Sequence, residues 1–438
     1  MIPTDLEVRA GRIDGAVTVP GSKSVTHRSF LLAAQSTKPC TVTSPLLSAD
    51  TWATLSCLLA LGARFRLDSE RPEAVQFQPM PFAAPHQALD CANSGTTLRL
   101  MAGTAARLTQ PITLTGDASL QSRPNGTLLD ALSSLGVRAT SNVGKAPLTV
   151  RGPLRSGAVT LPPASSSQFA SSLLLALPFV AGASTLTMAP PVSSSPYLDV
   201  TLDVAARAGL RIAEDAASGR TFRFSGNQSV TATELPVDGD WSSAAFLFAA
   251  AAVTGGGITV HGLDAASRQG DRRILNLLAS FGADVLLRSD GVRVNGGSLE
   301  TPGEINVAAT PDLFPVLCVV AAASRGCTTF TGGASLRSKE TDRIASMAQG
   351  LRAMGIKVQE QPDGLQVEGG RLQGASVASH GDHRIHMAFA VAGLAARGLT
   401  RIDDATCADV SYPGFHDALS ACGAPFTLLQ GNHAGVAR

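Results

Sequence analysis

Hydrophobic and polar positions repeat along the chain at a nearly constant interval. In each repeat an amphipathic segment with helical spacing ends on a small or apolar residue, and a glycine follows before a β-rich stretch begins. These glycines stand at intervals of 74, 73, 73, 73 and 68 residues: Gly62, Gly136, Gly209, Gly282, Gly355 and Gly423. Each fits the position just after a helix, where a left-handed residue stops it. The pattern predicts six copies of one supersecondary unit.

Each repeat also contains a second helical segment in which small apolar residues occupy nearly every face. The six segments are residues 24–37, 94–108, 167–182, 242–254, 312–325 and 383–397. A helix that is apolar all round is buried, so each repeat pairs one buried helix with one half-exposed helix. Val- and Thr-rich stretches such as T-V-T-S and I-T-V-H predict short strands between them. We therefore expect an α/β fold.

The chain has 438 residues, which is too long for a single hydrophobic core. Six repeats divide into two domains of three. The boundary between the third and fourth repeats falls near E-L-P-V-D-G-D at residues 234–240.

Composition narrows the classes of function. The 35 basic and 34 acidic residues nearly balance, which excludes a general nucleic-acid or anionic-membrane surface, so any anion binding is local. The longest apolar stretches, residues 173–183 and 244–253, are shorter than the ~20 residues of a membrane span. The N-terminus lacks the apolar region of a signal peptide, and the seven scattered cysteines form no C-x-x-C pair. We expect a cytoplasmic protein with reduced thiols.

Residues 20–28 read P-G-S-K-S-V-T-H-R and suggest an anion site. A nucleotide-binding loop of the Walker type needs glycine directly before the lysine, and here Ser22 stands between Gly21 and Lys23. This spacing disfavours a nucleotide loop. A plain turn before a helix remains the alternative.

Polar residues gather at the starts of the buried helices. Capping of the helix N-terminus explains about half of them, such as Asn93, Ser94, Asp240 and Asp382. Capping does not explain the others: Lys23, Arg28, Gln168 and Arg384. A cation at a helix N-terminus is slightly unfavourable unless an anion lies between the two. We therefore predict a small polyanionic substrate bound between the two domains.

Two further clusters stand at the starts of half-exposed helices. Arg123, in R-P-N-G, has a side chain suited to clamping a carboxylate or phosphate. In L-R-S-K-E-T-D-R at residues 336–343, Lys339 and Arg343 share a face if the segment is helical, with Glu340 adjacent. The alternative for this segment is a solvated, charged helix start.

Three histidines stand in S-H-G-D-H-R-I-H, and His383 and His386 have a spacing that a metal could use. The sequence lacks H-E-x-x-H, and Arg384 would repel a cation, so a metal site is disfavoured. A G-x-S-x-G nucleophile elbow is also absent.

An ordered set of motifs spans nearly the whole chain: P-G-S-K-S-x-x-x-R, N-S-G-T, R-P-N-G, S-S-Q-F, S-P-Y-L-D, K-E-T-D-R and D-H-R. The set closely resembles the 5-enolpyruvylshikimate-3-phosphate (EPSP) synthase family of enolpyruvyl transferases. The resemblance implies a two-domain inverse α/β barrel-like fold with six βαβαββ repeats, three per domain. It also implies an N-terminal domain of residues 20–237, a C-terminal domain of residues 1–19 and 238–438, and an active site in the cleft between them.

By resemblance, the chain is a 3-phosphoshikimate 1-carboxyvinyltransferase of the shikimate pathway, on the route to chorismate and aromatic amino acids. It would move the enolpyruvyl group of phosphoenolpyruvate to the 5-hydroxyl of shikimate 3-phosphate, as a monomer without metal or organic cofactor. The residues that would bind shikimate 3-phosphate are Lys23, Ser24, Arg28, Ser166, Ser167, Gln168, Ser194, Asp312 and Lys339. Those that would bind phosphoenolpyruvate are Lys23, Gly95, Arg123, Gln168, Arg343 and Arg384.

The resemblance also implies catalytic roles, and the chemistry agrees with them. The attacking hydroxyl needs a base, and the enol methylene needs a proton on the way to a tetrahedral intermediate. Asp312 would be the base and Glu340 the proton donor and acceptor at the methylene, with Lys23 and His383 assisting.

Two positions depart from the family pattern. Val410 stands where many members have a lysine, and Ser335 where many have an asparagine. We expect activity with weaker binding of phosphoenolpyruvate. The family is the target of glyphosate, which occupies that site, and the retained Gly95 predicts sensitivity.

Two rival functions are open. The first is the sister transferase acting on UDP-N-acetylglucosamine, whose Lys-Asn pair is here Lys23-Ser24 and whose reactive cysteine has no clear counterpart. The second is a non-catalytic scaffold that binds anions, which the joint presence of Asp312 and Glu340 disfavours.

Overall fold

The structure is a computed structural model of the chain and describes residues 4–68, 73–215 and 220–430. Residues 1–3 and 431–438 of the predicted C-terminal domain, and residues 69–72 and 216–219 of the predicted N-terminal domain, lie outside the described residues. The chain forms two compact units. The N-terminal unit is Gly21–Asp238, and the C-terminal unit joins Met1–Pro20 to Gly239–Arg438.

The described strands of the N-terminal unit form three four-stranded sheets, with strand orders β14-β3-β5-β4, β6-β7-β9-β8 and β10-β11-β13-β12. Their bounds are β3 (Cys40–Thr43), β4 (Arg64–Leu67), β5 (Ala74–Gln78), β6 (Leu89–Asp90), β7 (Ile112–Thr115), β8 (Arg138–Asn142), β9 (Lys145–Arg151), β10 (Ala158–Leu161), β11 (Ser184–Met188), β12 (Ile212–Asp215), β13 (Arg220–Phe224) and β14 (Glu234–Pro236).

In the described ranges of the C-terminal unit three more sheets have the orders β16-β17-β15-β2, β18-β19-β21-β20 and β22-β23-β1-β24. Their strands are β1 (Thr4–Val8), β2 (Asp14–Thr18), β15 (Gly257–His261), β16 (Asp284–Arg288), β17 (Gly291–Asn295), β18 (Glu304–Asn306), β19 (Cys327–Thr331), β20 (Lys357–Gln361), β21 (Gly364–Glu368), β22 (Ser376–Val377), β23 (Thr400–Ile402) and β24 (Phe426–Gln430).

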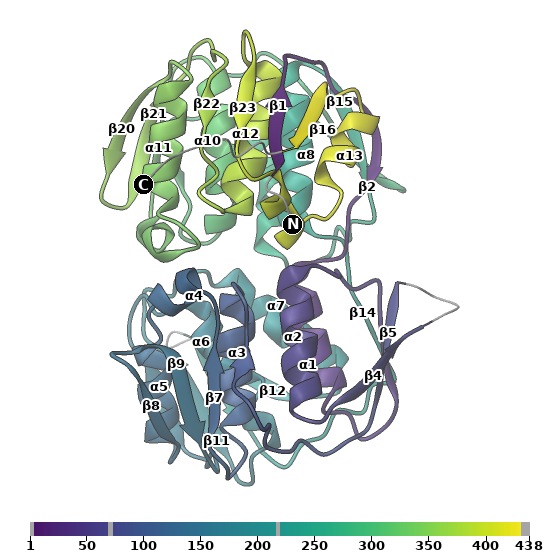
Figure 1. Cartoon of the computed structure of the whole chain (residues 1–438), viewed down its shortest axis with the longest axis vertical. Coiled ribbons are helices and arrows are strands. Elements are labelled where there is room, and N and C mark those ends of the chain that lie inside the picture. Colours follow the sequence, from purple (N-terminus) through teal and green to yellow (C-terminus); the bar gives the residue numbers. More distant parts are fainter. Residues whose placement is uncertain (1–3, 69–72, 216–219, 431–438) are drawn as a thin grey trace. The chain divides into compact units, whose positions relative to one another are not determined.

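Every sheet has the same plan: one edge strand pairs parallel with its neighbour, and the other two pairings in the sheet are antiparallel. In the sheet of β6 to β9, β6 pairs parallel with β7, and β9 lies antiparallel between β7 and β8. Chain order within this unit is therefore βαβαββ. Three sheets include a strand from far along the chain: β14 joins β3, β2 joins β15, and β1 lies between β23 and β24, as Figure 1 shows by the purple β1 beside β23. The predicted fold class is confirmed.

The predicted buried helices are present and buried. They are α1 (Lys23–Ala33), α3 (Gly95–Ala105), α6 (Ser167–Leu174), α8 (Trp241–Thr254), α10 (Phe314–Ala323) and α12 (His383–Ala395). Their small residues allow close packing, most extensively between α3 and α6 in one unit and among α8, α10 and α12 in the other. Each unit has its own hydrophobic core built around these helices.

Several predicted helix ranges were longer than the observed helices. Residues 167–182 form α6 and then a separate 3-10 turn, η1 (Leu177–Phe179), because Pro178 cannot donate a backbone hydrogen bond to a continuing helix. The first helix ends at Ala33, and the fifth begins at Phe314 after a 3-10 turn, η3 (Pro311–Leu313).

The half-exposed helices end as the repeat predicts. They are α2 (Ala49–Ala60), α5 (Gly126–Ser134), which follows the short α4 (Ala118–Ser122), α7 (Pro196–Arg207), α9 (Ile274–Ser280), α11 (Arg343–Ala353) and α13 (Phe415–Ala421). All six repeat glycines have φ between 81° and 100°. After each glycine, the next N–H reaches back five residues to a helix carbonyl, as from Ala63 to Leu58. This bond is the Schellman motif, so each glycine stops its helix by the same physical means.

Candidate active site

The first buried helix of the N-terminal unit is tied to its neighbours at its N-terminal end. Lys23 opens α1, and its Nζ lies 3.0 Å from Oδ2 of Asp50 in the first turn of α2. The hydroxyl of Thr97, in the first turn of α3, donates to the backbone carbonyl of Asp50 at 3.3 Å. These contacts bring the starts of α1, α2 and α3 to one end of the unit.

Several polar side chains converge on the start of α3. Arg99 donates from Nη1 to Oε1 of Gln168 at 2.6 Å, and Gln168 donates from Nε2 to the hydroxyl of Thr96 at 3.0 Å. A methyl group added at Gly95 would lie 3.1 Å from Nη1 of Arg123 and 3.7 Å from Nη1 of Arg99. Gly95 thus leaves open the space towards which two guanidinium groups point.

Arg28 occupies a different environment from the other predicted cations. Its side chain is buried, and its guanidinium donates to the hydroxyl of Thr201 at 2.7 Å, to the hydroxyl of Ser171 at 3.1 Å and to the carbonyl of Ser24 at 2.8 Å. Burial lowers the pKa of Arg28 to about 10, which still leaves it charged at neutral pH. The residue links α1, α6 and α7 within the unit.

The predicted serines stand at helix starts in the same unit. Ser166 caps α6, where its hydroxyl accepts from the backbone N–H of Gln168 at 3.3 Å, and Ser167 is buried in the first turn. Ser194 lies just before α7 with φ 52°, a left-handed conformation uncommon for a serine. Residues held in such conformations often belong to binding sites.

A network of ion pairs centred on Arg343 forms the corresponding cluster of the C-terminal unit. Arg343 is 1 % exposed and donates from Nε to Asp382 at 2.7 Å, from Nη1 to Asp312 at 2.9 Å and from Nη2 to Glu340 at 2.8 Å. These three carboxylates raise the pKa of Arg343 against the opposing effect of burial. One planar guanidinium therefore fixes the positions of Asp312 and Glu340 relative to each other.

Asp312 lies where several cations meet. Its Oδ1 is 2.9 Å from Nη1 of Arg343 and 3.7 Å from Nζ of Lys339, and its Oδ2 is 3.0 Å from Nη2 of Arg384. Burial lowers the pKa of Lys339, and the negative charge of Asp312 opposes that change. The cluster brings together the predicted residues Asp312, Lys339, Glu340, Arg343 and Arg384.

The prediction that Lys339 and Arg343 share a face assumed that the whole K-E-T-D-R segment is helical. The structure shows that only its last residue, Arg343, belongs to a helix. The helix α11 begins at Arg343, because the side chain of Asp342 caps it by accepting from the N–H of Ala345 at 3.0 Å. Lys339 precedes the helix, yet both cations reach Asp312. Since Arg343 is buried, the alternative of a solvated charged helix start is wrong for this residue.

Four residues of these clusters were not predicted from the sequence: Asp50, Arg99, Asp271 and, as an ion-pair partner, Asp382. Asp382 accepts from the N–H of Arg384 at 2.8 Å as the cap of α12 and also binds Arg343. Arg99 could have been found, since it is the one charged residue of its helix and lies one turn after Gly95. Asp50 and Asp271 carry no such local signal.

Asp271 is a buried carboxyl group of the same unit. It is 3 % exposed and accepts a hydrogen bond from the hydroxyl of Ser242. Burial, followed by the nearby negative charge of Asp312, raises the pKa of Asp271 to about 7, while Arg384 acts in the opposite direction. A carboxyl group that titrates near neutral pH thus lies beside the Arg343 network.

The three histidines of S-H-G-D-H-R-I-H lie in different surroundings, and His380 is exposed. His383 is buried in the first turn of α12. His386 lies one turn further, and its Nε2 is 2.9 Å from Nε2 of His416 on α13. Within the described ranges, no group of three or more metal-ligating side chains has a geometry that could hold a metal ion.

The two departing positions lie in 3-10 turns. Val410 ends η5 (Ala405–Val410) and is half-buried, and Ser335 is exposed in η4 (Ala334–Ser338). In the part of the chain that the structure describes, no helix is long and apolar enough to cross a membrane.

The chain is similar over most of its length to proteins of known family. A family model described as EPSP synthase (3-phosphoshikimate 1-carboxyvinyltransferase) matches residues 8–419. The 3-phosphoshikimate 1-carboxyvinyltransferases of Methanothrix thermoacetophila and Methanocorpusculum labreanum are 45% and 43% identical, and each alignment covers 96% of this chain and 98% of the relative. A solved EPSP synthase from Acinetobacter baumannii matches with a TM-score of 0.81 at 29% identity, covering 98% of this chain and 100% of that one.

Proposed function

Because the chain belongs to the EPSP synthase (3-phosphoshikimate 1-carboxyvinyltransferase) family, we propose that residues of both units together bind shikimate 3-phosphate and phosphoenolpyruvate. The chain is a transferase of the shikimate pathway, which leads to aromatic amino acids. It transfers the enolpyruvyl group to the 5-hydroxyl of shikimate 3-phosphate. The relatives carry the name of this activity and not of the transferase for UDP-N-acetylglucosamine, so that alternative is not favoured.

The observation that best supports the proposed site is the Arg343 network. Asp312 and Glu340 both bind one buried guanidinium, at 2.9 and 2.8 Å. The reaction needs one group that accepts a proton from the attacking hydroxyl and one that donates a proton to the methylene carbon. Two carboxylates held at a fixed separation meet this need, since their positions do not have to reorganise during the reaction.

In the proposed mechanism the 5-hydroxyl oxygen attacks C2 of phosphoenolpyruvate while Asp312 accepts the hydroxyl proton. Glu340 donates a proton to the methylene carbon, which becomes a methyl group in a tetrahedral intermediate. Glu340 then removes a proton from that methyl group, the bond from C2 to the phosphate oxygen breaks, and phosphate leaves. The cations around Asp312 stabilise its charged form, which is the form that accepts a proton.

The substrates carry phosphate and carboxylate groups, and we assign these to the cations. In the N-terminal unit, Lys23, Arg123 and the amide of Gln168 would bind phosphoenolpyruvate in the space that Gly95 leaves open. In the C-terminal unit, Arg343 and Arg384 would bind it beside the reacting carbon. Arg99, which bonds to Gln168, joins this group as a further anion-binding residue.

For shikimate 3-phosphate we propose the helix starts and nearby side chains: Lys23, Ser24, Ser166, Ser167, Gln168, Ser194, Asp312 and Lys339. The N–H groups at a helix N-terminus favour a phosphate. The role of Arg28 is narrower than the resemblance implies. Its guanidinium donates to Thr201, Ser171 and Ser24, which favours a positioning role in which it orders the start of α1. His383 is proposed to assist from the first turn of α12.

The remaining features follow from the same site. Val410 stands where many family members have a lysine, so one cation is missing and we expect weaker binding of phosphoenolpyruvate. The two proposed catalytic carboxylates, Asp312 and Glu340, are unaffected by this difference. Gly95 leaves room for glyphosate as well, so we expect inhibition by it. All seven cysteines are free, which agrees with a reducing cytoplasm, and we propose that the chain acts as a monomer.

The test is the release of phosphate by purified protein supplied with phosphoenolpyruvate and shikimate 3-phosphate. Release that requires both compounds supports the proposal. Release that requires UDP-N-acetylglucosamine in place of shikimate 3-phosphate, or no release with either acceptor, would refute it.

A further inference from the structure

The three buried helices of the N-terminal unit end around a pocket at the opposite end from this unit's own candidate site residues. Lys23, Gly95 and Gln168 lie at the N-terminal ends of α1, α3 and α6, and the pocket lies beyond the C-terminal ends of the same helices. The 11 residues of α3 separate the two ends by roughly 16 Å. The pocket is therefore distinct from the residues assigned to the two substrates.

The pocket has the size and lining of a small-molecule site. Its volume is about 550 Å³, within the range of roughly 300 to 1,000 Å³ that is usual for ligand pockets. Most of the lining is apolar, and it includes a thioether and two aromatic rings: Ala34, Met80, Pro81, Phe82, Leu108, Pro153, Leu154, Phe179, Val180 and Ala181. The polar lining residues are Gln35, Thr104 and Arg107.

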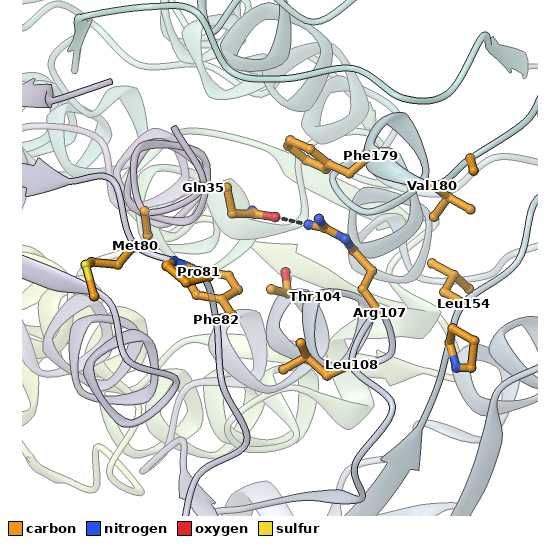
Figure 2. Close-up of a pocket in the computed structure, with 13 residues that line it drawn as sticks. Gln35, Met80, Pro81, Phe82, Thr104, Arg107, Leu108, Leu154, Phe179 and Val180 are labelled. Atoms are coloured by element: carbon orange, nitrogen blue, oxygen red, sulfur yellow. Dashed lines mark hydrogen bonds between the residues drawn. The ribbon is translucent and has the colours of Figure 1, made fainter. Parts of the chain in front are cut away.

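Arg107 is the only charged residue among those described around the pocket. Arg107 lies in the turn that follows α3, and Figure 2 shows its side chain reaching towards Gln35, to whose Oε1 it donates a hydrogen bond from Nη1. Its guanidinium carbon lies 4.4 Å from the centre of the Phe179 ring. Gln35 in turn donates from Nε2 to the carbonyl of Leu31 at 2.7 Å, which holds its oxygen towards Arg107.

The charge of Arg107 has no anionic counterpart within the described part of the chain. Its guanidinium contacts a neutral amide and an aromatic face, and no carboxylate of the described residues forms an ion pair with it. Burial lowers the pKa of Arg107 to about 10, and no carboxylate offsets that change. A carbonyl-rich helix C-terminus favours a cation, but that preference explains neither the partial burial nor the apolar pocket beside it. A partly buried cation next to apolar walls fits a ligand with one negative charge and an apolar body.

We propose that this pocket binds a small aromatic monocarboxylate, with the carboxylate on Arg107 and the ring against the apolar wall that includes Met80, Phe82 and Leu154. A planar guanidinium matches a carboxylate in a two-bond geometry. Aromatic rings and a methionine thioether favour a flat apolar body over a branched one.

Isothermal titration calorimetry with 3-phenylpropionate tests the proposal, and 3-phenylpropanamide is the uncharged probe of the same shape. Four proteins are compared: the wild type, Arg107→Gln, Ala181→Phe and Arg138→Gln. Ala181 is an exposed residue of the pocket wall, so a phenyl group there fills the pocket while Arg107 is kept. Arg138 is exposed on β8 and serves as the control for loss of one arginine.

We expect saturable binding of the carboxylate to the wild type and to Arg138→Gln. Loss of a charge-assisted pair should weaken binding to Arg107→Gln by roughly tenfold to a hundredfold, and Ala181→Phe should abolish it. If Arg107→Gln does not fold, as judged by circular dichroism, Ala181→Phe decides the question. Equal binding of the amide, equal binding to Ala181→Phe or no binding to the wild type would overturn the proposal. The readout is binding, so it does not depend on turnover of the two substrates.

Discussion

Replacing Arg343 by lysine keeps the charge at the centre of the C-terminal cluster but removes its planar fork. Arg343 makes four hydrogen bonds to three carboxylates: two to Asp382 at 2.7 and 3.3 Å, one to Asp312 at 2.9 Å and one to Glu340 at 2.8 Å. A lysine ammonium has three donors on one atom at the end of a shorter reach. It cannot span all three carboxylates at these distances.

The cost follows from the bonds that are lost. A hydrogen bond between charged groups contributes about 1.5–3 kcal/mol, and the fully buried Asp382 would lose part of its ion pair with residue 343. We therefore expect Arg343→Lys to lower the free energy of unfolding by about 2–4 kcal/mol. In a unit of this size that loss lowers the melting temperature by roughly 5 to 15 °C. Because Asp312 and Glu340 lose their common anchor, kcat should fall by about a hundredfold or more.

The assay combines differential scanning calorimetry with steady-state release of phosphate. Arg352→Lys is the matched control, since Arg352 lies on the same helix, α11, and is exposed. The reasoning is refuted if Arg343→Lys melts at the same temperature as Arg352→Lys and retains the same kcat.

Three further predictions concern single side chains. A methyl group at Gly95 would lie 3.1 Å from Nη1 of Arg123 and would fill part of the proposed binding space. Gly95→Ala should therefore fold normally, raise KM for phosphoenolpyruvate roughly tenfold to a hundredfold and weaken inhibition by glyphosate. An unchanged KM would contradict the position assigned to phosphoenolpyruvate. Burial raises the pKa of Asp271 to about 7, so the carboxyl group destabilises the folded state increasingly as the pH rises from about 4 to 7, and the full penalty is present above pH 7. Asp271→Asn should therefore gain on the order of 2 to 4 kcal/mol of unfolding free energy over the wild type at pH 8 and almost nothing at pH 4. Urea unfolding at both pH values measures this gain, and equal gains at the two values would refute it. Burial lowers the pKa of His386 to about 3 and that of His416 to about 4, so the folded state loses stability as the pH falls below about 6.5. His416→Gln should reduce this loss of unfolding free energy by up to about 3 kcal/mol at pH 4. If the variant and the wild type lose stability equally with acid, the two histidines do not cause the loss.

The fold was predictable because its signals are local and repeated. A glycine that stops a helix acts through its own φ and the bond made by the next residue, so the sequence shows each stop directly, as at Gly209. All-apolar helices such as α8 likewise show their burial in composition alone. Helix ends were less predictable: Pro178 broke one buried helix early, and Asp342 set the start of α11 later than the spacing of charges indicated.

The candidate site was predictable only in part, because it depends on contacts between distant segments. The charges of Lys339 and Arg343 were visible, but their common partner Asp312 lies about thirty residues away and is brought there by folding. Asp50 and Asp271 are single acids in unremarkable segments, and only packing places them beside Lys23 and Ser242. Arg28 was assigned to substrate from its motif, although most of its contacts hold helices together.

The most direct test of the account is the incorporation of deuterium from D₂O into the vinyl group of the product, followed by proton NMR. If Glu340 protonates the methylene carbon and then removes a proton from the resulting methyl group, the wild type should produce a deuterated vinyl group. Glu340→Gln should lose both turnover and incorporation, while Glu304→Gln, an exposed control on β18, should behave as the wild type. Release of phosphate without deuterium in the product, or wild-type incorporation by Glu340→Gln, would contradict the account.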